Sequence, residues 1–367
     1  MIYIHIPFCR KACHYCNFHF STNLKTMDAV IAAIEWELVL RKDYVQGEIN
    51  SVYFGGGTPS ILPPGTIQRL MDRIRQTFNV VPDAEITLET NPDDITADQL
   101  ELWKQAGINR LSIGIQSFFE EDLVWMNRAH NALQARQAIE LAQQAGFFNI
   151  TIDLIYGGPT LPDEHWRENV ATAVALNIPH LSCYALTVEP QTALDKMIIQ
   201  HKKEEVDPDK QSRHFELLML WAAEAGYEHY EISNFAKPGY RSRHNSSYWA
   251  GTPYLGVGPG AHSFNGSSRQ WNVSNNTLYY KRIGQQQLPF EIEYLTPEQQ
   301  VNEYIMTSLR TIEGLDTSKL SPAEAERVNQ LAEKYIRTNA LTRNGSCLVL
   351  TNAGRLLADG IAADLFC

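Results

Sequence analysis

The chain has 367 residues, which is enough for a large barrel with a smaller appended module. Its net charge of −11 argues against binding nucleic acid through phosphates, because such binding needs a basic face. No apolar run is as long as a membrane-spanning helix, and a strand pattern begins directly after Met1, which leaves no room for a leader peptide. We therefore expect a cytoplasmic protein with no transmembrane segment and no nucleic-acid partner. Peripheral contact with the inner membrane surface and homodimer formation are left open.

The first two thirds of the chain alternate short β-rich runs with longer amphipathic segments, which is typical of a parallel sheet with crossover helices. Six strand patterns predict an α/β fold, namely a partial (β/α)6 barrel that resembles a TIM barrel and is open on one side. Thr96 and Gln99 predict a capping box at the start of one helix, and Gly107 predicts its end. The six strands are expected at Ile2–Ile6, Ser51–Phe54, Ala84–Glu89, Arg110–Ile115, Asn149–Ile155 and His180–Thr187.

A change of composition predicts a domain boundary between residues 1–285 and residues 286–367. Within the first part, a further strand is expected at Glu228–Ile232. The stretch Phe235–Trp271 that follows is rich in Gly, Asn and aromatic residues. It is interpreted as too polar for a core and too aromatic for a linker.

The second part predicts a small α+β module. Thr296 and Ser321 each begin a capping box with Pro at the first helical position. Asn344-Gly345 predicts a hairpin, and residues 351–365 predict a last helix. The order helix, helix, hairpin, helix resembles a winged-helix domain.

Three cysteines, Cys9, Cys13 and Cys16, lie close together near the amino terminus. Clustered thiols in a reducing compartment indicate a metal site, and soft thiolates suit zinc or an iron–sulfur cluster. Both sites normally take four protein ligands, and no fourth Cys or paired His follows at finger spacing. Three ligands would leave one iron of a [4Fe–4S] cluster open. Ordinary buried thiols, or a zinc site completed by His14 and His19, remain alternatives at this point.

Other candidate residues follow the predicted strands at the rim where (β/α) barrels carry their active sites. The three consecutive glycines in Gly55-Gly56-Gly57-Thr58 have no Cβ atoms, so the backbone there can pass close to a ligand. Glu89 ends the third strand on its polar face, and Gln116 ends the fourth with both a donor and an acceptor. Asp153 is an acid in an apolar strand, which is costly to bury without a partner. Alone, each motif is also typical of a tight turn or a solvated side chain.

The Cys-x3-Cys-x2-Cys spacing, with Tyr15 before the last cysteine, resembles the cluster loop of radical S-adenosylmethionine (SAM) proteins. Residues Tyr3 to Cys9 narrow the resemblance to the oxygen-independent coproporphyrinogen III oxidase-like family, which also contains haem chaperones. The resemblance implies a radical SAM barrel and the C-terminal domain of that family. It also implies a [4Fe–4S] cluster on Cys9, Cys13 and Cys16, with SAM on the open iron. By position, it implies SAM contacts from Tyr3, Tyr15, Gly56, Gly57, Thr58, Glu89, Gln116, Arg128 and Asp153.

The segment from His244 to Trp249 has the His-Asn-x-x-Tyr-Trp pattern of the haem-chaperone branch. The resemblance implies that His244 contacts haem, for which His is a common ligand, although a His packed in a polar loop is also typical of such a composition. The oxidases carry a further Cys two positions after the third cysteine, where this chain has Phe18. They also carry an extension before the first strand. Both departures favour the chaperone branch.

The resemblance therefore implies a haem chaperone that binds a [4Fe–4S] cluster, SAM and haem and delivers haem to acceptor haemoproteins. It further implies an electron donor such as a flavodoxin or ferredoxin. The alternative is the oxidase, in which a radical derived from SAM starts the decarboxylation of coproporphyrinogen III to protoporphyrinogen IX. Whether the chain is an enzyme is left open, because the departures argue against oxidase activity while the resemblance allows SAM cleavage. A winged-helix nucleic-acid binder is a third reading, and the acidic charge argues against it.

Overall fold

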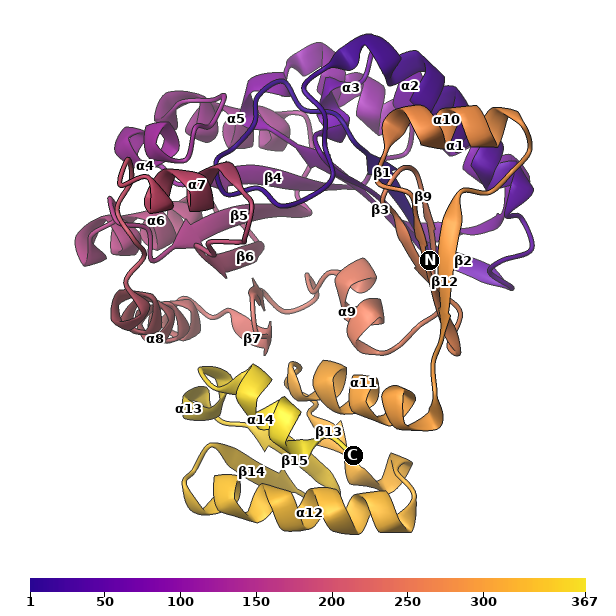
Figure 1. The fold of residues 1–367 in the computed structure, drawn as a ribbon. Coiled ribbons are helices and arrows are strands. Elements are labelled where there is room, and N and C mark those ends of the chain that lie inside the picture. Colours follow the sequence, from indigo (N-terminus) through magenta and orange to yellow (C-terminus); the bar gives the residue numbers. More distant parts are fainter.

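The computed structural model describes residues 1–367. Its centre is a curved nine-stranded sheet in the order β7-β8-β6-β5-β4-β3-β2-β1-β9, so the sheet does not close into a full barrel (Figure 1). Six strands are parallel and neighbour one another in chain order, which confirms the predicted partial (β/α)6 barrel. These strands are β1 (Ile2–Ile6), β2 (Glu48–Gly56), β3 (Asn79–Thr90), β4 (Arg110–Gln116), β5 (Ile150–Tyr156) and β6 (His180–Ala185).

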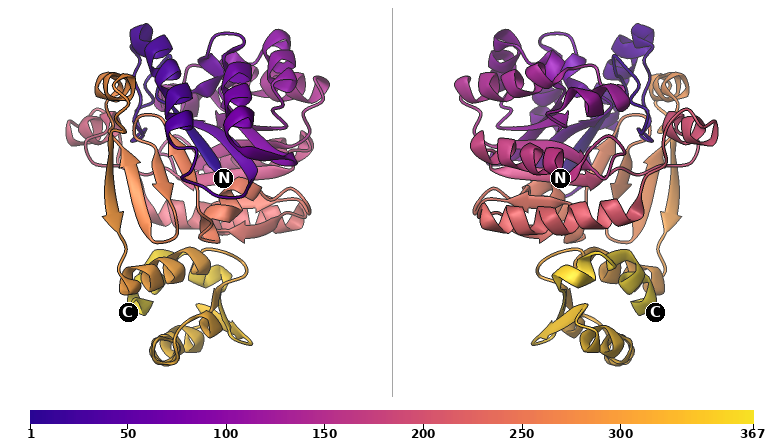
Figure 2. Two further views of the ribbon diagram at one scale, coloured as in Figure 1. Left: turned by 90° about the vertical axis from the view of Figure 1, so that its right-hand side faces the viewer. Right: turned by 90° about the vertical axis from the view of Figure 1, so that its left-hand side faces the viewer.

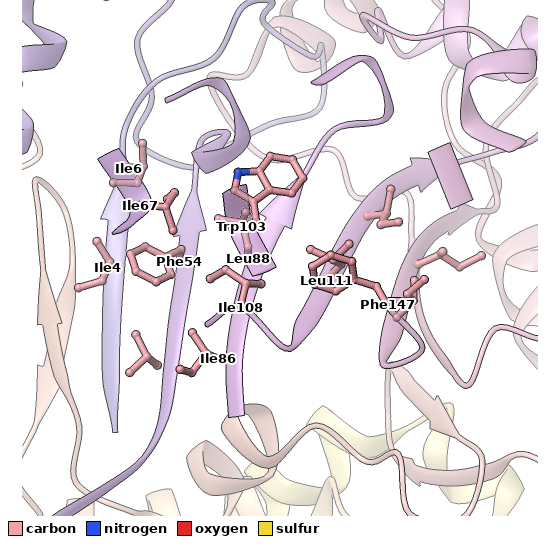
Figure 3. Packing of buried hydrophobic residues seen from close by; sticks show 14 of the residues in the cluster. Ile4, Ile6, Phe54, Ile67, Ile86, Leu88, Trp103, Ile108, Leu111 and Phe147 are labelled. Carbon is pink, nitrogen blue, oxygen red and sulfur yellow. The ribbon is translucent and has the colours of Figure 1, made fainter. Parts of the chain in front are cut away.

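Crossover helices cover the convex face of the sheet (Figures 1 and 2). Ile4, Ile6 and Leu88 are fully buried on that side, and Figure 3 shows them in one layer with Phe54 and Trp103. The apolar residues that alternate along each strand thus make one continuous core with the helices. The helices between β1 and β7, which include these crossover helices, are α1 (Met27–Leu40), α2 (Thr66–Thr77), α3 (Ala97–Gln105), α4 (Glu120–Trp125), α5 (Ala132–Gln144), α6 (Asp163–Ala175), α7 (Ala193–Ile199) and α8 (Pro208–Glu224), with short 3-10 turns η1 (Leu24–Thr26), η2 (Pro59–Ile61) and η3 (Pro92–Asp94).

The ends of α3 match the prediction only in part. The Thr96 hydroxyl accepts a hydrogen bond from the Gln99 backbone N–H, but the return bond of a full capping box is not formed. Gly107 follows the helix with φ of +91°, as predicted for a glycine at a helix end.

Both edges of the six-stranded unit carry additional strands. β7 (Glu228–Glu231) and β8 (Asn234–Ala236) extend the β6 edge in antiparallel fashion, and β9 (Leu255–Val257) pairs in parallel with β1. Leu255 and Val257 are fully buried. The interpretation of the 235–271 stretch as too polar for the core is therefore wrong at β9, because a three-residue strand with Gly256 at its centre is too short to show a strand pattern.

The rest of that stretch lies on the concave side of the sheet. Figure 1 shows α9 (Arg243–Trp249) under the arch of strands, and α9 contacts both β2 and α11. β10 (His262–Phe264), β11 (Ser268–Asn272) and β12 (Phe290–Tyr294) form a separate antiparallel sheet. α10 (Asn276–Gly284) packs on α1. β12 follows residue 286 and pairs with β11, and the domain boundary at that residue stays a prediction.

The C-terminal module lies below the barrel and has its own hydrophobic core (Figures 1 and 2). Both predicted capping boxes, at Thr296 and Ser321, are formed with Pro at the first helical position, and the predicted hairpin is present. A short strand joins that hairpin to make three antiparallel strands. The elements are α11 (Pro297–Leu309), β13 (Leu315–Asp316), η4 (Thr317–Lys319), α12 (Pro322–Arg337), β14 (Leu341–Asn344), β15 (Cys347–Leu350), α13 (Asn352–Arg355) and α14 (Ala358–Leu365).

The single last helix predicted over residues 351–365 is wrong, because the chain breaks between α13 and α14. Leu356 packs against the core of the barrel, whereas Ala358 and Ile361 pack into the core of the module. A straight helix could not direct Leu356 to the barrel core and also direct Ala358 and Ile361 to the module core, because the two cores lie in different directions. The turn between the helices lets neighbouring residues face each of them.

Candidate functional site

The three clustered cysteines lie in an irregular loop that leaves the end of β1. The loop is closed at its base, where the backbone N–H of Cys9 donates to Ser21 O at 3.1 Å. It is held at its tip by His14, whose backbone N–H donates to Met126 O at 3.2 Å and whose carbonyl accepts from the Leu194 N–H at 2.7 Å. The loop is therefore held by hydrogen bonds at its base and at its tip, although it contains no helix or strand of its own.

A pocket of about 430 Å³ lies between this loop and the carboxyl ends of the parallel strands. Its walls come from the ends of β2 to β6, which is where parallel α/β barrels bind their ligands. The structure brings eleven predicted site residues into this one pocket. They are Cys9, Cys13, Cys16, Tyr15, Gly56, Gly57, Thr58, Glu89, Gln116, Arg128 and Asp153.

The thiols of Cys9, Cys13 and Cys16 are partly buried in the pocket wall and form no disulfide. Burial raises the pKa of Cys9 to about 11, because its thiolate would lose solvation. Such a group ionises readily only when a cation compensates the charge, and a metal centre supplies one. The donor set of three soft, partly buried sulfurs thus fits an iron–sulfur cluster.

The zinc alternative does not fit the loop. Ligands of a single ion must converge on one atom, at about 2.3 Å for a Zn–S bond, and no three His, Cys, Asp or Glu side chains lie together in this way. His14 Nδ1 lies 3.2 Å from Trp125 O, and His19 Nε2 lies 2.8 Å from Asn276 Oδ1. A cube binds each thiolate through a different iron, so its ligands need not converge on a single point.

Arg128 connects the cysteine loop to the strands. One terminal nitrogen of its guanidinium donates to Cys13 Sγ at 3.2 Å and to the Tyr15 hydroxyl at 3.3 Å. The other donates to Asn91 Oδ1 and to Gly114 O, both at 2.9 Å. Its Nε is buried and has no hydrogen-bond partner.

Glu89 ends β3 and faces the pocket beside the glycine motif. Its Oε1 accepts a hydrogen bond from the Tyr53 hydroxyl at 2.8 Å, and its Oε2 accepts one from the Gly56 backbone N–H at 3.1 Å. Burial, reinforced by the nearby carboxyl of Asp153, raises the pKa of Glu89 to about 8. The side chain is therefore held in place at the pocket wall, and its carboxyl stays protonated up to about pH 8.

Two further pocket residues come from β4 and β5. Burial raises the pKa of Asp153 to about 6, with Ser112 and Ser182 beside it. Gln116 has φ of +68°, a left-handed backbone that is uncommon for residues other than glycine. Non-glycine residues in this conformation concentrate at functional sites, and here the turn directs the end of β4 to the pocket.

The glycine motif brings two segments close together. A Cβ on Gly57 would lie 2.7 Å from Phe8 O, next to the cysteine loop. A Cβ on Gly56, where φ is +110°, would lie 2.7 Å from the His5 ring. These positions therefore let the end of β2 pass directly under the start of the loop.

Two predicted site residues lie outside the pocket. Tyr3 is on the concave face of β1, where its hydroxyl contacts His5 Nδ1 at 3.1 Å. His244 is 1% exposed, with Nδ1 at 2.8 Å from Ser51 Oγ and Nε2 at 3.0 Å from the Tyr248 hydroxyl. An axial iron ligand needs a free ring nitrogen, and neither nitrogen of His244 is free. In this structure both ring nitrogens of His244 are hydrogen-bonded, and its role as a haem contact stays a prediction.

Sequence reasoning missed Tyr53, Asn91 and Tyr184. Asn91 binds Arg128 and also donates to Thr58 Oγ1 at 3.4 Å, and Tyr184 lines the pocket from the end of β6. The signal for Tyr53 was present, because Ser51, Tyr53 and Gly55 alternate on one face of β2. The positions of Asn91 and Tyr184 depend on which strand ends meet, which local pattern does not reveal.

Together the open parallel barrel, the three-cysteine loop and the glycine motif define the class of radical SAM proteins. The sequence pattern of the radical SAM superfamily matches residues 3–173, and that of the HemN C-terminal domain matches residues 295–357. The structure superposes on coproporphyrinogen III oxidase (HemN) from Escherichia coli, a radical SAM enzyme, with a TM-score of 0.85 and 25% identity. This match covers 100% of the present chain and 89% of the oxidase.

Within that class, relatives named heme chaperone HemW match nearly the whole chain. The Mycobacterium tuberculosis protein is 35% identical over 370 residues, covering 99% of this chain and 94% of the relative. The Bacillus subtilis protein is 32% identical, covering 98% and 97%. The Escherichia coli protein is 39% identical over 270 residues, covering 71% and 69%. The chain belongs to the HemW family.

None of the helices combines the length and the apolar character that crossing a membrane requires.

Proposed function

We propose that the protein is a haem chaperone that holds a [4Fe–4S] cluster and SAM and delivers haem to acceptor haemoproteins. The observation that carries this proposal is that relatives named for this activity match nearly the full length of both chains. The pocket supports the cofactor part of the proposal, because it gathers three thiols, a glycine motif and an arginine at one rim.

In this proposal Cys9, Cys13 and Cys16 hold the cluster and leave one iron for SAM. Arg128 would bind the carboxylate of SAM, and the backbone around Gly56 would pass beside its methionine portion. Glu89 and Asp153 would accept hydrogen bonds from its ammonium or ribose groups. When bound and reduced by an electron donor such as a flavodoxin or ferredoxin, the cluster would supply one electron to SAM.

The direct test is haem transfer. The anaerobically reconstituted protein is loaded with haem and mixed with a haem-free acceptor haemoprotein, and the Soret band of the acceptor is followed. We expect the acceptor to gain haem faster from the loaded protein than from free haem at the same concentration. Equal rates of transfer from the loaded protein and from free haem, or no haem binding at all, would reject the proposal that the protein is a haem chaperone.

A second candidate is oxygen-independent coproporphyrinogen III oxidase, which the full-length similarity to HemN favours. An anaerobic assay with coproporphyrinogen III, SAM and dithionite separates the two. The chaperone proposal predicts that no protoporphyrinogen IX forms. Formation of protoporphyrinogen IX at a catalytic rate would establish the oxidase instead.

A further inference from the structure

His244 lies in the interior of the barrel, at a distance from the solvent and directly behind the pocket wall. It is the second residue of α9, whose first turn is fixed by Glu85 of β3. The carboxylate of Glu85 accepts hydrogen bonds from the backbone N–H groups of Arg243 at 3.0 Å and His244 at 2.9 Å. The imidazole is therefore held by its own backbone as well as by its two ring nitrogens, which contact Ser51 and Tyr248.

The imidazole packs against the residue that holds Glu89. Its ring stacks on the ring of Tyr53, with centroids 5.0 Å apart and planes at 29°. Tyr53 is the residue whose hydroxyl donates to Glu89 Oε1 at 2.8 Å. The other carboxylate oxygen of Glu89 accepts from the Gly56 N–H. A continuous line of contacts thus runs from α9 to the carboxylate at the pocket wall.

Two aromatic rings stack on Tyr53, those of His244 and Tyr3. On its other side, Tyr3 stacks with centroids 6.1 Å apart, and Gly55 offers no side chain. Burial lowers the pKa of His244 to about 3, so its ring is neutral and adds no charge beside Tyr53. Its effect on Tyr53 is therefore one of shape and packing.

We propose that His244 is a positioning residue for SAM binding: it holds the Tyr53 ring so that the Tyr53 hydroxyl fixes Glu89 in the pocket wall. This inference rests on the proposed function, because it takes the pocket as the SAM site. It gives His244 a different role from that of the haem contact implied by the resemblance. It also explains how α9, which lies on the concave side of the sheet, contributes to a pocket formed by strand ends.

The test measures the dissociation constant of SAM for the cluster-loaded protein by equilibrium dialysis. His244→Ala removes the ring behind Tyr53, and we expect affinity to fall about tenfold, the size expected for one misplaced hydrogen-bonding group. His244→Phe keeps a ring but no polar atom, and we expect affinity within about twofold of the wild type. Tyr53→Phe keeps the stack but loses the hydroxyl, and we expect the same loss as for His244→Ala.

His180→Ala is the matched control. His180 is equally buried, and its ring nitrogens contact Thr151 and the Tyr230 hydroxyl, but it does not touch Tyr53. We expect its SAM affinity to equal that of the wild type, even if the protein is less stable. An equal loss in His180→Ala and His244→Ala would show general destabilisation and overturn the inference.

The double variant Tyr53→Phe/His244→Ala tests the line of contacts directly. If His244 acts through Tyr53, the double variant binds SAM no more weakly than either single variant. Additive losses, or wild-type affinity in His244→Ala, would overturn the inference. If the alanine variant does not fold, the comparison of His244→Phe with Tyr53→Phe decides: retained affinity in the first and loss in the second are required.

Haem titration and crystallography separate this inference from the proposed function. We expect His244→Ala to bind haem as the wild type does, and its crystal structure to show a displaced Tyr53 ring. Loss of haem binding with unchanged SAM affinity would return His244 to the role of iron ligand. A wild-type protein that binds no SAM would reject the proposed SAM site, while an unmoved Tyr53 ring would reject the positioning role independently.

Discussion

Burial in the pocket wall raises the pKa of Glu89, and this effect can be tested without cofactors. Its pKa of about 8 in the folded chain compares with a usual value of 4.5. Between these values the folded state binds a proton that the unfolded state has released. The contribution of Glu89 to stability is therefore complete below about pH 4.5 and is lost as the pH rises through about 8.

We predict that Glu89→Gln removes this pH dependence. Before cluster reconstitution, the free energy of unfolding of the wild type should fall relative to that of the variant as the pH rises from about 5 to 8. Denaturant titration at several pH values measures this difference. A difference that stays constant across the range would show that the carboxyl of Glu89 ionises normally.

Gly57 tests the close approach of β2 to the cysteine loop. In Gly57→Ala the new Cβ would lie 2.7 Å from Phe8 O and 2.9 Å from Ile6 O, both of which are backbone atoms that cannot turn aside. We expect a loss of about 1–3 kcal/mol in the free energy of unfolding, together with reduced iron uptake. Gly158→Ala is the control, because its Cβ would meet only Leu186 Cδ2 at 3.7 Å. Equal effects of both changes would contradict the expected clash.

Individual side chains were predictable where a strand pattern determines them. The alternation along β3 places Glu89 on the concave face, and the end of a strand places it at the rim. Strand alternation does not predict the position of His244, because His244 lies in the short helix α9, which irregular segments connect to the rest of the barrel. Tyr3 alternates onto the concave face of β1 as the pattern predicts, and it does not line the pocket.

At the scale of elements, α1 holds the strands that follow α9 through one buried carboxylate. Glu37 is fully buried and accepts hydrogen bonds from the Gly258 N–H at 2.9 Å, the Tyr279 hydroxyl at 2.6 Å and the Asn272 amide at 2.7 Å. It also pairs with Arg41 one turn further along α1 at 3.5 Å. The network joins the first helix to β11 and α10.

We predict that Glu37→Ala costs about 3–5 kcal/mol in the free energy of unfolding, because it leaves the charge of Arg41 buried without its partner. Glu35→Gln is the control on the same helix, since Glu35 pairs with the largely exposed Arg69 and should cost less than about 1 kcal/mol. Denaturant unfolding measures both. A loss below about 1 kcal/mol for Glu37→Ala would mean that the network adds nothing to the packing of α10.

The long elements were predictable and the short ones were not. Six parallel strands and the two capped helices of the module carry strong local signals, and the structure confirms them. β9 is recognisable only through its pairing with β1. The break between α13 and α14 depends on two cores that lie in different directions, which the sequence pattern does not record.

At the scale of the whole molecule, the pocket and the C-terminal module are separate. All residues that line the pocket come from positions 9 to 189, whereas the module begins after β12 and contacts the β7 side of the barrel. The backbone N–H of Ile232 donates to Arg310 O at 3.1 Å, and that of Ile312 donates to Tyr230 O at 2.9 Å. The likeness to HemN covers the whole chain, including both the barrel with its pocket and the C-terminal module.

We predict that the thiolates of Cys9, Cys13 and Cys16 hold an iron–sulfur cluster and leave one iron open. Iron and sulfide content after anaerobic reconstitution tests it most directly, comparing the wild type with Cys9→Ser, Cys13→Ser and Cys16→Ser, and with Cys347→Ser, which lies in the C-terminal module. We predict about four irons and four sulfides per chain in the wild type and in Cys347→Ser, and near-complete loss in the other three. A wild type without iron, or full iron content after replacement of Cys9, Cys13 and Cys16 together, would contradict the account.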